Sequence, residues 1–408
     1  MAGLRCGLAM LLVLGSAPTD AFAPPGPSFG RFQVQAAPRL RGAHIERLGG
    51  ALPSATRMAT EAQQSNQEVL VRELKEELPQ LMDASYTPKW DLYSSKVKFV
   101  DPLNEFDGVE KYKSNIQLLK DSPLFTDAQM SLHDAVGQDD GTVITRWTLA
   151  MTFKAFPWRP RVTFTGTSTY YMDDDGKVSK HVDMWDSIDN QSPFSLQALQ
   201  DLVGQLLPDV TKRGVAAIKG GAAEEVTYTV VRRAPGIEVR RYDEFEVVET
   251  EEEGVYSKET YNEAKGLIRD YHGDALADPT NKEKKQLPVT DPVLQYDKGS
   301  GLTNLAYVHA TSVRGKAPAP ADGRLSVRPW GASLVAVKDV RGYGKDRTRS
   351  EASVQSGMDD LRKAVAAEGY LAADTNGEGF YLANYADGYE LWLPVEPTAR
   401  SLPTRSAQ

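Results

Sequence analysis

Few residues in this chain could bind a metal, and their types restrict the chemistry. The sequence has one cysteine, Cys6, and five histidines: His44, His133, His181, His272 and His309. A single thiol forms no internal disulfide and builds no cysteine-ligated zinc or iron–sulfur centre. A metal held by nitrogen must therefore be bound by one of these histidines.

A second set of side chains could perform acid–base chemistry. Alternation along a predicted strand places His181, Asp183 and Trp185 on one face, and we expect Asp101 and Arg146 near the mouth of a pocket. An aspartate in an apolar pocket can act as a general base. In the alternative interpretation, His181 and Asp183 make ordinary hydrogen bonds on the surface of the sheet. Trp147 and Trp185 then fill the core.

Motifs for nucleotide or acyl-group chemistry are missing from the sequence. It contains no Gly-x-Gly-x-x-Gly after a strand, no phosphate-binding Gly-Lys-Ser/Thr loop and no Gly-x-Ser-x-Gly elbow. The basic residues of 341–349 alternate with glycine and acids, which is typical of a solvated loop. Because the formal charge is −9, we expect no nucleic-acid partner.

The acid–base set must be positioned by residues 60–207, which we interpret as one α+β domain. A capping box at Thr60 and Gln63 predicts a helix that buries leucines as far as Leu81. A second helix is predicted with Asp107 as its N-cap, and a last one after Ser192, with Pro193 at its first position and its end near Leu207. Between them, period-two patterns predict strands over 143–154, 162–172 and 178–185.

Helices followed by a long antiparallel meander is the element order of an NTF2-like cone. Four blocks carry a closer likeness: residues 86–102, 145–149, 157–160 and 181–186. They resemble an uncharacterised NTF2-like domain of plants, algae and cyanobacteria. The resemblance implies the cone-shaped fold and supplies no activity.

Beyond a predicted flexible linker, residues 208–225, the chain repeats itself. Ile237–Tyr242 aligns with Leu325–Trp330, an offset of 88 residues, and each unit predicts two strands and then a helix. The helices are expected over 258–271 and, in the second unit, from Val354 to a stop at Gly369. Duplicated units of this kind indicate a pseudo-symmetric closed sheet with two helices against it.

Five blocks within residues 226–396 carry a further likeness: 238–242, 289–293, 317–320, 342–344 and 389–394. They resemble the SOUL family of heme-binding proteins. The resemblance implies a distorted, eight-stranded antiparallel β-barrel flanked by two helices, with heme b or another tetrapyrrole as its ligand. The chain departs from the family pattern at Val289, where methionine is usual, in Asp387-Gly388-Tyr389, where a basic run is usual, and in an inserted segment, 277–286.

The same resemblance places an apolar slot for the macrocycle along the helix 258–271. Its implied wall is Tyr261, Ala264, Leu267 and Ile268, with Lys265 and Arg269 reaching for the propionates, His272 as first candidate for the axial iron ligand and His309 as second. In the alternative interpretation, His272 only caps the C-terminus of the helix, where a cation is favoured.

The first residues have the pattern of targeting sequences. Arg5 before a short apolar run predicts a signal peptide over 1–21, and arginines outnumber acids in 22–59, which predicts a disordered transit peptide. The junction Ala21-Phe22-Ala23-Pro24 resembles that of proteins imported into complex plastids. Removing 1–59 takes the net charge from −9 to −13 because six basic and two acidic residues are lost, and it also removes Cys6. A secreted protein with a basic propeptide is the alternative. Residues 397–408 are predicted to be a disordered tail.

From this sequence we expect non-enzymatic binding, buffering or transfer of heme or a related tetrapyrrole in the plastid. One alternative makes the NTF2-like half a small-molecule enzyme, or a module that binds lipid or membrane, with the barrel accessory to it. Peripheral association with thylakoids or lipid droplets is an expectation of the same kind. A further alternative to tetrapyrrole binding makes the chain an adaptor protein whose pockets are filled by its own side chains. The pattern does not predict an oligomeric state.

Overall fold

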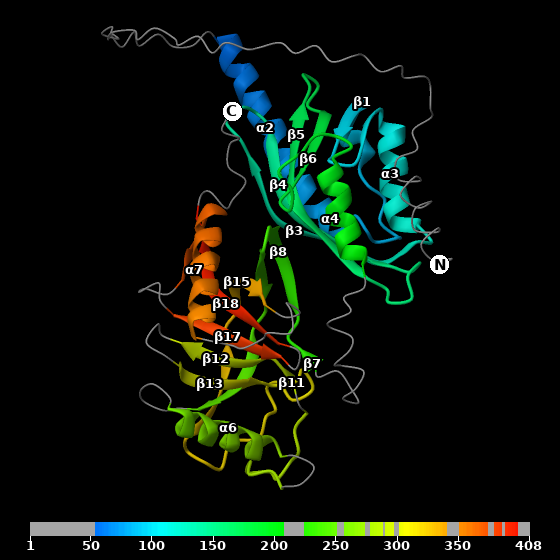
Figure 1. The fold of residues 1–408 in the computed structure, drawn as a ribbon. Coiled ribbons are helices and arrows are strands. Elements are labelled where there is room, and N and C mark those ends of the chain that lie inside the picture. The colour runs from blue at the N-terminus through cyan, green and yellow to red at the C-terminus, as the bar shows by residue number, and fades with distance from the viewer. Residues whose placement is uncertain are drawn as a thin grey trace, which may run out of the picture. The chain divides into compact units, whose positions relative to one another are not determined.

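The computed structural model describes residues 54–207, 224–250, 257–273, 278–288, 290–297, 302–340, 351–373, 379–385 and 388–398 (Figure 1). The predicted signal peptide, transit peptide up to residue 53, linker up to residue 223 and tail from residue 399 lie outside the described residues, as does the 342–344 block. The chain divides after Asn66, and all sheets belong to the unit of residues 67–408.

Three helices and two 3-10 turns accompany the first sheet: α2 (Ser54–Glu77), η1 (Leu78–Gln80), η2 (Trp90–Leu92), α3 (Val109–Asp121) and α4 (Leu196–Leu206). The helix predicted from Thr60 thus begins at Ser54.

The predicted N-caps of α3 and α4 are wrong. Gly108, with φ +100°, precedes α3 in place of Asp107. Ser195 caps α4 by accepting a hydrogen bond from the Ala198 N–H, because Phe194 has φ +61° and interrupts any helix that begins after Ser192.

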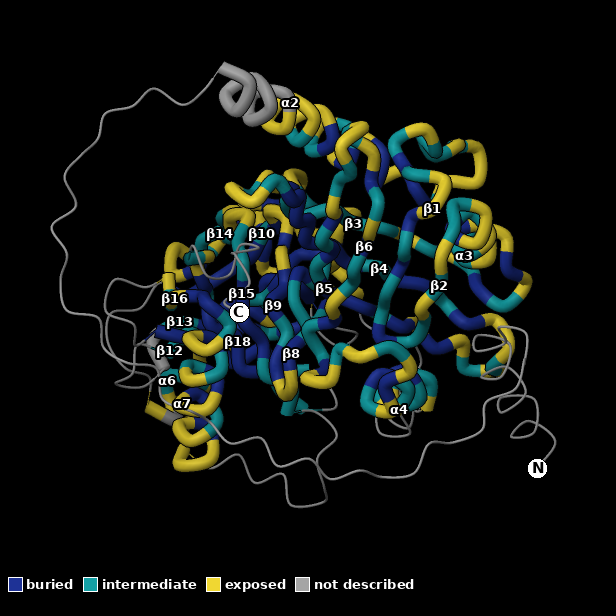
Figure 2. Tube along the Cα trace, turned by 90° about the horizontal axis from the view of Figure 1, so that it is seen from above, coloured by how far each residue is buried: buried dark blue, intermediate teal, exposed yellow. Residues whose placement is uncertain are grey.

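The first sheet has six strands in the order β2-β1-β6-β5-β4-β3. They are β1 (Tyr93–Val100), β2 (Glu105–Asp107), β3 (Phe125–Gly137), β4 (Val143–Phe153), β5 (Arg161–Met172) and β6 (Val178–Trp185). β1 and β6 run parallel, and the other neighbours are antiparallel. No sequence pattern predicted β1, β2 or β3, and the side chains of β3 are mostly half-buried and alternate weakly. The dark blue, buried stretches of Figure 2 run through the strands.

The second half consists of a two-stranded pair and a ten-stranded sheet. The pair is β7 (Glu224–Glu225) with β11 (Thr290–Asp291). The large sheet contains β8 (Tyr228–Ala234), β9 (Ile237–Tyr242), β10 (Phe245–Thr250), β12 (Val293–Asp297), β13 (Leu302–Val308), β14 (Leu325–Trp330), β15 (Ser333–Asp339), β16 (Tyr370–Ala372), β17 (Phe380–Tyr385) and β18 (Gly388–Pro397).

The order of this sheet confirms the predicted duplication. It is β14-β10-β13-β12-β17-β18-β15-β9-β8, with β16 beside β18. Phe245 pairs with Trp330, and the positions 88 residues away give the pair Ser333 with Tyr242, which is also present. Each repeat therefore places its first strand beside the second strand of the other repeat. The described strands form an open, curled sheet with β14 and β8 at its ends, so the predicted barrel is a half-barrel.

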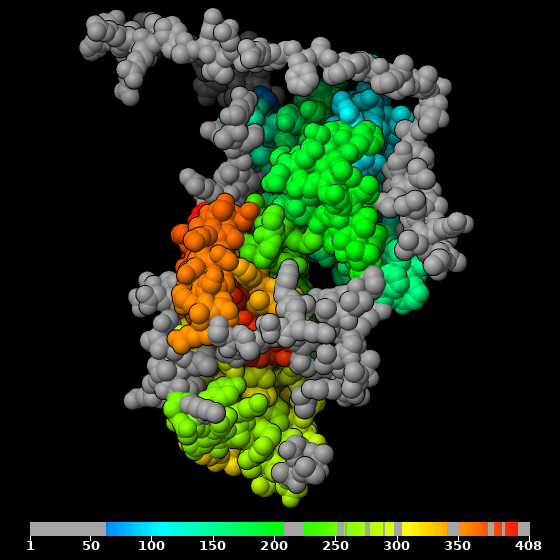
Figure 3. Space-filling view, viewed as in Figure 1, coloured from blue at the N-terminus to red at the C-terminus, as the bar shows by residue number. Residues whose placement is uncertain are grey.

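One helix from each repeat covers the sheet, as predicted: α6 (Lys258–His272) and α7 (Glu351–Ala367). The inner face of α7 is aliphatic and packs through Val354, Met358 and Leu361. The inner face of α6 packs through Ala264, Ile268 and Tyr271 onto residues of β10, β13 and β14. Both helices lie at the surface of the molecule, α7 in orange and α6 in yellow-green (Figure 3). The predicted α+β class is confirmed for both halves.

Candidate functional site

The implied heme-binding residues of α6 fall into two groups. Ala264 and Ile268 are fully buried against the sheet, so their side chains are part of the core. Tyr261 and Leu267 are half-buried, while Lys265 and Arg269 are exposed. On α6, the accessible part of the implied binding site is therefore limited to Tyr261 and Leu267 of the apolar wall and to the two cationic side chains.

Half-buried residues of the neighbouring strands extend this accessible strip. Val293 of β12 and Tyr307 of β13 pack against the same core cluster as Tyr261. The Tyr261 hydroxyl accepts a hydrogen bond from the Gln295 amide at 2.6 Å. Burial raises the pKa of the Tyr307 phenol to about 12, and the positive charge of Arg269, which is paired with Asp270 at 2.9 Å, opposes that shift. An apolar, aromatic strip flanked by cations thus lies along one side of α6.

The structure brings His272 and His309 together, although 37 positions separate them in the sequence. Their ring centroids are 5.7 Å apart, and the ring planes are inclined to each other by 66°. The Nδ1 of His272 lies 2.9 Å from the Ile268 carbonyl, and the Nδ1 of His309 lies 2.9 Å from Glu246 Oε1. Each Nδ1 donates to its oxygen partner, so each Nε2 keeps its lone pair.

Both imidazoles are neutral at pH 7. Burial lowers the pKa of His272 to about 4, and burial also lowers the pKa of His309 against the opposing effect of Glu246. The His309 Nε2 is buried without a hydrogen-bond partner, and its side chain is 0% exposed. A neutral imidazole with its second nitrogen anchored to a carboxylate or carbonyl has the form of a metal ligand. His272 is buried as well, at 6% exposed, and of the two histidines only His272 lies on α6, the helix that carries the accessible strip.

The sequence blocks that carry the SOUL resemblance meet in the core of the sheet. Glu390, 0% exposed, accepts hydrogen bonds at Oε2 from Arg240 Nη1 at 3.0 Å, Trp392 Nε1 at 2.7 Å and the Tyr385 hydroxyl at 3.1 Å. The Arg240 guanidinium also lies 4.2 Å from the centroid of the Tyr228 ring. These residues hold β9, β17 and β18 together, which is a structural role that the sequence blocks alone do not reveal.

A cavity of about 330 Å³ lies on the sheet face opposite α6, and sequence reasoning missed it. Side chains alternate along β13, so Leu305 and Tyr307 face the helix while Ala306 faces the cavity. The other lining residues are Glu249, Leu294, Tyr296, Asn304, Arg328, Trp330 and Tyr381. The Arg328 guanidinium is bound to the Glu249 carboxylate, so the walls combine aromatic rings with one ion pair.

The predicted acid–base residues of the first half lie in a buried network. The Tyr112 hydroxyl is 2.6 Å from His181 Nδ1, and Asp183 Oδ1 is 2.8 Å from His181 Nε2 but off line for a hydrogen bond. The Ser168 hydroxyl donates to the same carboxylate at 2.5 Å. Burial, with Asp183 as the next cause, raises the pKa of Asp101 to about 6. Tyr93, Tyr112 and Tyr170 fill the space around this network.

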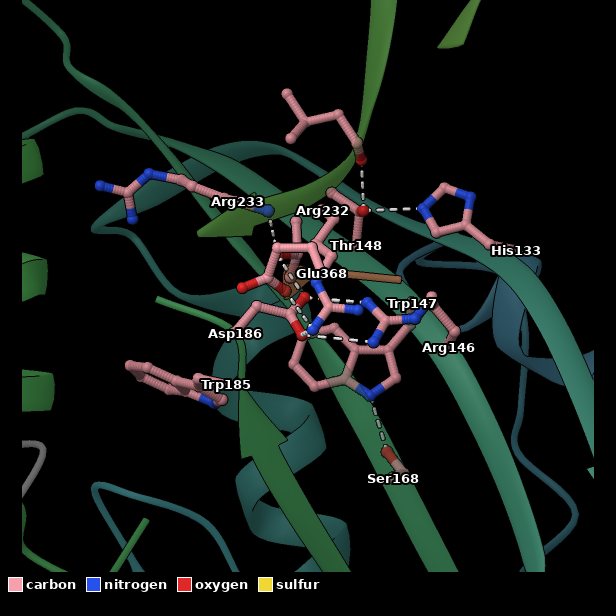
Figure 4. Close-up of polar contacts among 12 residues, drawn as sticks. His133, Arg146, Trp147, Thr148, Ser168, Trp185, Asp186, Arg232, Arg233 and Glu368 are labelled. Atoms are coloured by element: carbon pink, nitrogen blue, oxygen red, sulfur yellow. Dashed lines mark hydrogen bonds and ion pairs between the residues drawn. The ribbon is translucent and has the colours of Figure 1, made fainter. Parts of the chain in front are cut away.

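Arg146 does not join that network. It lies on the other face of β4, where its guanidinium binds Asp186 at 2.9 Å, and both side chains are 7% exposed. Figure 4 shows Asp186 beside Arg146 and Arg232, and Arg232 belongs to β8 of the second half. The polar face of the first sheet therefore contacts the edge of the second.

Two restrictions apply to the described part of the chain. No group of three or more His, Cys, Asp or Glu side chains within it is placed to hold a metal ion. No helix within it is long and apolar enough to cross a membrane.

Comparisons with protein families confirm the predicted order of the two halves. Residues 223–394 match the model of the SOUL heme-binding protein, and residues 68–181 match that of an uncharacterised conserved protein, DUF2358. The chain thus carries a SOUL heme-binding domain after a DUF2358 region. No curated protein matches the chain.

Among solved structures, the chain is similar to proteins of low sequence identity. An NTF2-like protein of unknown function from Exiguobacterium sp. 255-15 is 22% identical, covers 28% of this chain and 98% of its own, and has a TM-score of 0.24. A putative polyketide cyclase from Xanthomonas campestris is 16% identical, covers 36% and 99%, and has a TM-score of 0.26. An epoxide hydrolase-like protein from M. tuberculosis is 17% identical, covers 33% and 90%, and has a TM-score of 0.25.

Proposed function

We propose that the second half of the chain binds heme b or a related tetrapyrrole and buffers or transfers it in the plastid without catalysing a reaction. The observation that carries the proposal is the match of residues 223–394 to the SOUL heme-binding protein. It is supported by a difference between the two repeats: α7 packs through aliphatic residues, while two neutral histidines meet at α6, His272 at the end of the helix and His309 directly after β13.

The residues along α6 supply each interaction that a porphyrin needs. Tyr261 and Leu267 offer apolar contact to the macrocycle, and Lys265 and Arg269 offer charge to two propionates. His272 offers a neutral imidazole with a free Nε2. Bound heme iron would supply a metal centre open to axial ligands. His309 is enclosed, so its part is to pack beside His272 and fix the position of that ring.

Absorbance titration of the full chain with hemin tests the proposal. We expect a saturable shift of the Soret band, and a similar saturable change with protoporphyrin, since the wall and the cations do not require iron. His272→Ala should change the ferric spectrum while leaving protoporphyrin binding intact. Absence of a saturable change with either ligand would contradict tetrapyrrole binding.

The cations of α6 can be tested against the equivalent helix of the other repeat. Lys265→Glu should weaken hemin binding several-fold, because it places a like charge near the propionates. Lys363 of α7 is also exposed, so Lys363→Glu changes the net charge equally on the other helix. Equal weakening by both variants would assign the effect to net charge and exclude a site on α6.

The plastid location rests on the targeting pattern of the first residues alone. Residues 1–59 fused to a fluorescent protein should carry it into a complex plastid, and Phe22→Ala should stop the fusion protein before plastid entry. Secretion of the fusion protein would support the basic-propeptide alternative.

A further inference from the structure

The two ends of the ten-stranded sheet are protected in different ways. An edge strand presents unpaired N–H and C=O groups, which can pair with a strand of another molecule. At one end, β14 contains Pro329, which has no N–H to offer. At the other end, β8 has the sequence Tyr-Thr-Val-Val-Arg-Arg-Ala, which is rich in strand-forming residues and contains no proline.

Threonine side chains of the first half bind the main chain of β8. The Thr148 hydroxyl of β4 donates to the Val230 carbonyl, and the Arg233 N–H donates to the Thr165 hydroxyl of β5 at 2.8 Å (Figure 4). The pairing of β8 with β9 shifts by one residue between Val230 and Arg232, and such a bulge redirects main-chain groups. Two groups at the edge of β8 are thereby satisfied by side chains.

A directed chain of hydrogen bonds holds Thr148 in this role. The Arg241 guanidinium donates to His133 Nδ1 at 3.2 Å, so the proton of the neutral ring is on Nε2. The His133 Nε2 is 2.8 Å from the Thr148 hydroxyl oxygen and donates to it. The threonine therefore has its proton available for the Val230 carbonyl. Burial, then the charge of Arg241, lowers the pKa of His133 to about 4, which keeps the ring neutral.

Ion pairs bind the same strand at the two residues that follow the bulge. Arg233 Nη1 lies 2.8 Å from Asp201 Oδ1 of α4, and Arg232 Nη2 lies 2.5 Å from Glu368 and 3.8 Å from Asp186. Side chains of these pairs are at most 26% exposed. Partly buried ion pairs disfavour other docking geometries, because separating the partners leaves a charge without compensation. Glu368 belongs to the second half itself, so the pairs that join the two halves are Arg233 with Asp201 and, at the longer distance, Arg232 with Asp186.

We propose that the first half of the chain, which ends at residue 207, covers the β8 edge of the second half. We also propose that a second copy of this chain pairs with the β8 edge when the contact between the two halves is loosened. β8 of the second copy offers the same sequence in an antiparallel arrangement. This role for the first half requires no substrate and is independent of tetrapyrrole binding.

The test uses the full chain with Thr148→Val and Thr165→Val combined, changes that keep shape and remove both hydroxyls. Thr169→Val is the matched control, since Thr169 lies on the same face of β5, four residues from Thr165. We expect the Arg233 amide to exchange with solvent up to about tenfold faster in the double variant, since one hydrogen bond is lost. Sedimentation velocity should show a concentration-dependent dimer in the double variant and a control that behaves as the wild type. A circular dichroism spectrum identical to that of the wild type establishes that both variants are folded.

A third substitution tests which surface forms the dimer. Arg233→Pro removes an N–H that is donated to Thr165 and not to β9, so the sheet keeps its bonds. Added to the double variant, it should restore the monomer. Unchanged amide exchange in the double variant would overturn the covering role. Faster exchange without a dimer, or a dimer that persists with Arg233→Pro, would overturn pairing between two copies.

Discussion

Glu390 provides the most direct test of what holds the half-barrel together. Its carboxylate accepts three hydrogen bonds at one oxygen and faces Arg240, which is 3% exposed. Glu390→Gln keeps the shape of the side chain and removes its charge. Among the described residues, the guanidinium then retains only Glu238 as a charged partner, at 2.8 Å and with a side chain 29% exposed.

The expected loss of stability arises because the buried Arg240 guanidinium keeps only one of its two carboxylate partners. Breaking a buried ion pair by removing one partner destabilises a protein by about 3–5 kcal/mol. Because Glu238 remains, we expect the lower end, about 3 kcal/mol. With an m-value of about 2 kcal/mol/M, the urea midpoint would fall by about 1.5 M.

Urea unfolding followed by tryptophan fluorescence measures this change, and a double variant isolates the pair. The double variant Arg240→Met with Glu390→Leu removes both charges. Its loss of unfolding free energy should be well below the sum of the losses of Arg240→Met alone and Glu390→Leu alone. A midpoint for Glu390→Gln within about 0.3 M of the wild type, or additive losses in the double variant, would refute the reasoning.

Three further outcomes are expected. The neutral His272 and His133 have pKa values of about 4 in the folded chain, below the ordinary 6.5, so the unfolded chain binds more protons between these values. The contribution of these neutral histidines to the free energy of unfolding is complete above pH 6.5 and is lost as the pH falls toward 4. For the buried His272 the loss is up to about 3 kcal/mol. A urea midpoint that stays constant from pH 7 to 4.5 would contradict this. Gly166→Ala should lower the melting temperature, because its Cβ would lie 2.1 Å from the Met184 carbonyl oxygen in the next strand. Gly266→Ala in α6 meets nothing within 4 Å and should raise stability by up to about 1 kcal/mol, and calorimetry that ranks the two variants in the opposite order would contradict both expectations.

Local patterns predicted the described α-helices and several of the strands, but not β1, β2 or β3. The spacing of Val354, Met358 and Leu361 predicts α7, and all three residues are buried on its inner face. The offset of 88 residues predicts the duplication because both repeats keep the same alternation. The start of α4 could not be predicted in this way, since the positive φ of Phe194 is set by the surrounding structure and Ser192 is as good a cap by type as Ser195.

Long-range proximity explains what the sequence could not predict about the candidate site. His272 and His309 were predicted as ligands from family resemblance, and only the pairing of β13 with β10 under α6 brings their rings together. The block around Arg240 identifies a family without revealing that Glu390 is its partner, 150 positions away. The alternation of β4 placed Thr148 on the face opposite Trp147, but nothing in the pattern indicated that β8 would bind there.

The exchange of first strands between the repeats also sets the order of events during synthesis. β9 pairs with β15, and β10 pairs with β14, so neither repeat completes its sheet from its own residues. While residues up to β13 are on the ribosome, β9 has only β8 beside it, and its second neighbour is made about 90 residues later. Pairing at such separation is slow because loop closure precedes any gain in contacts. During that interval the nascent β9 offers an open edge on the side where β15 will pair.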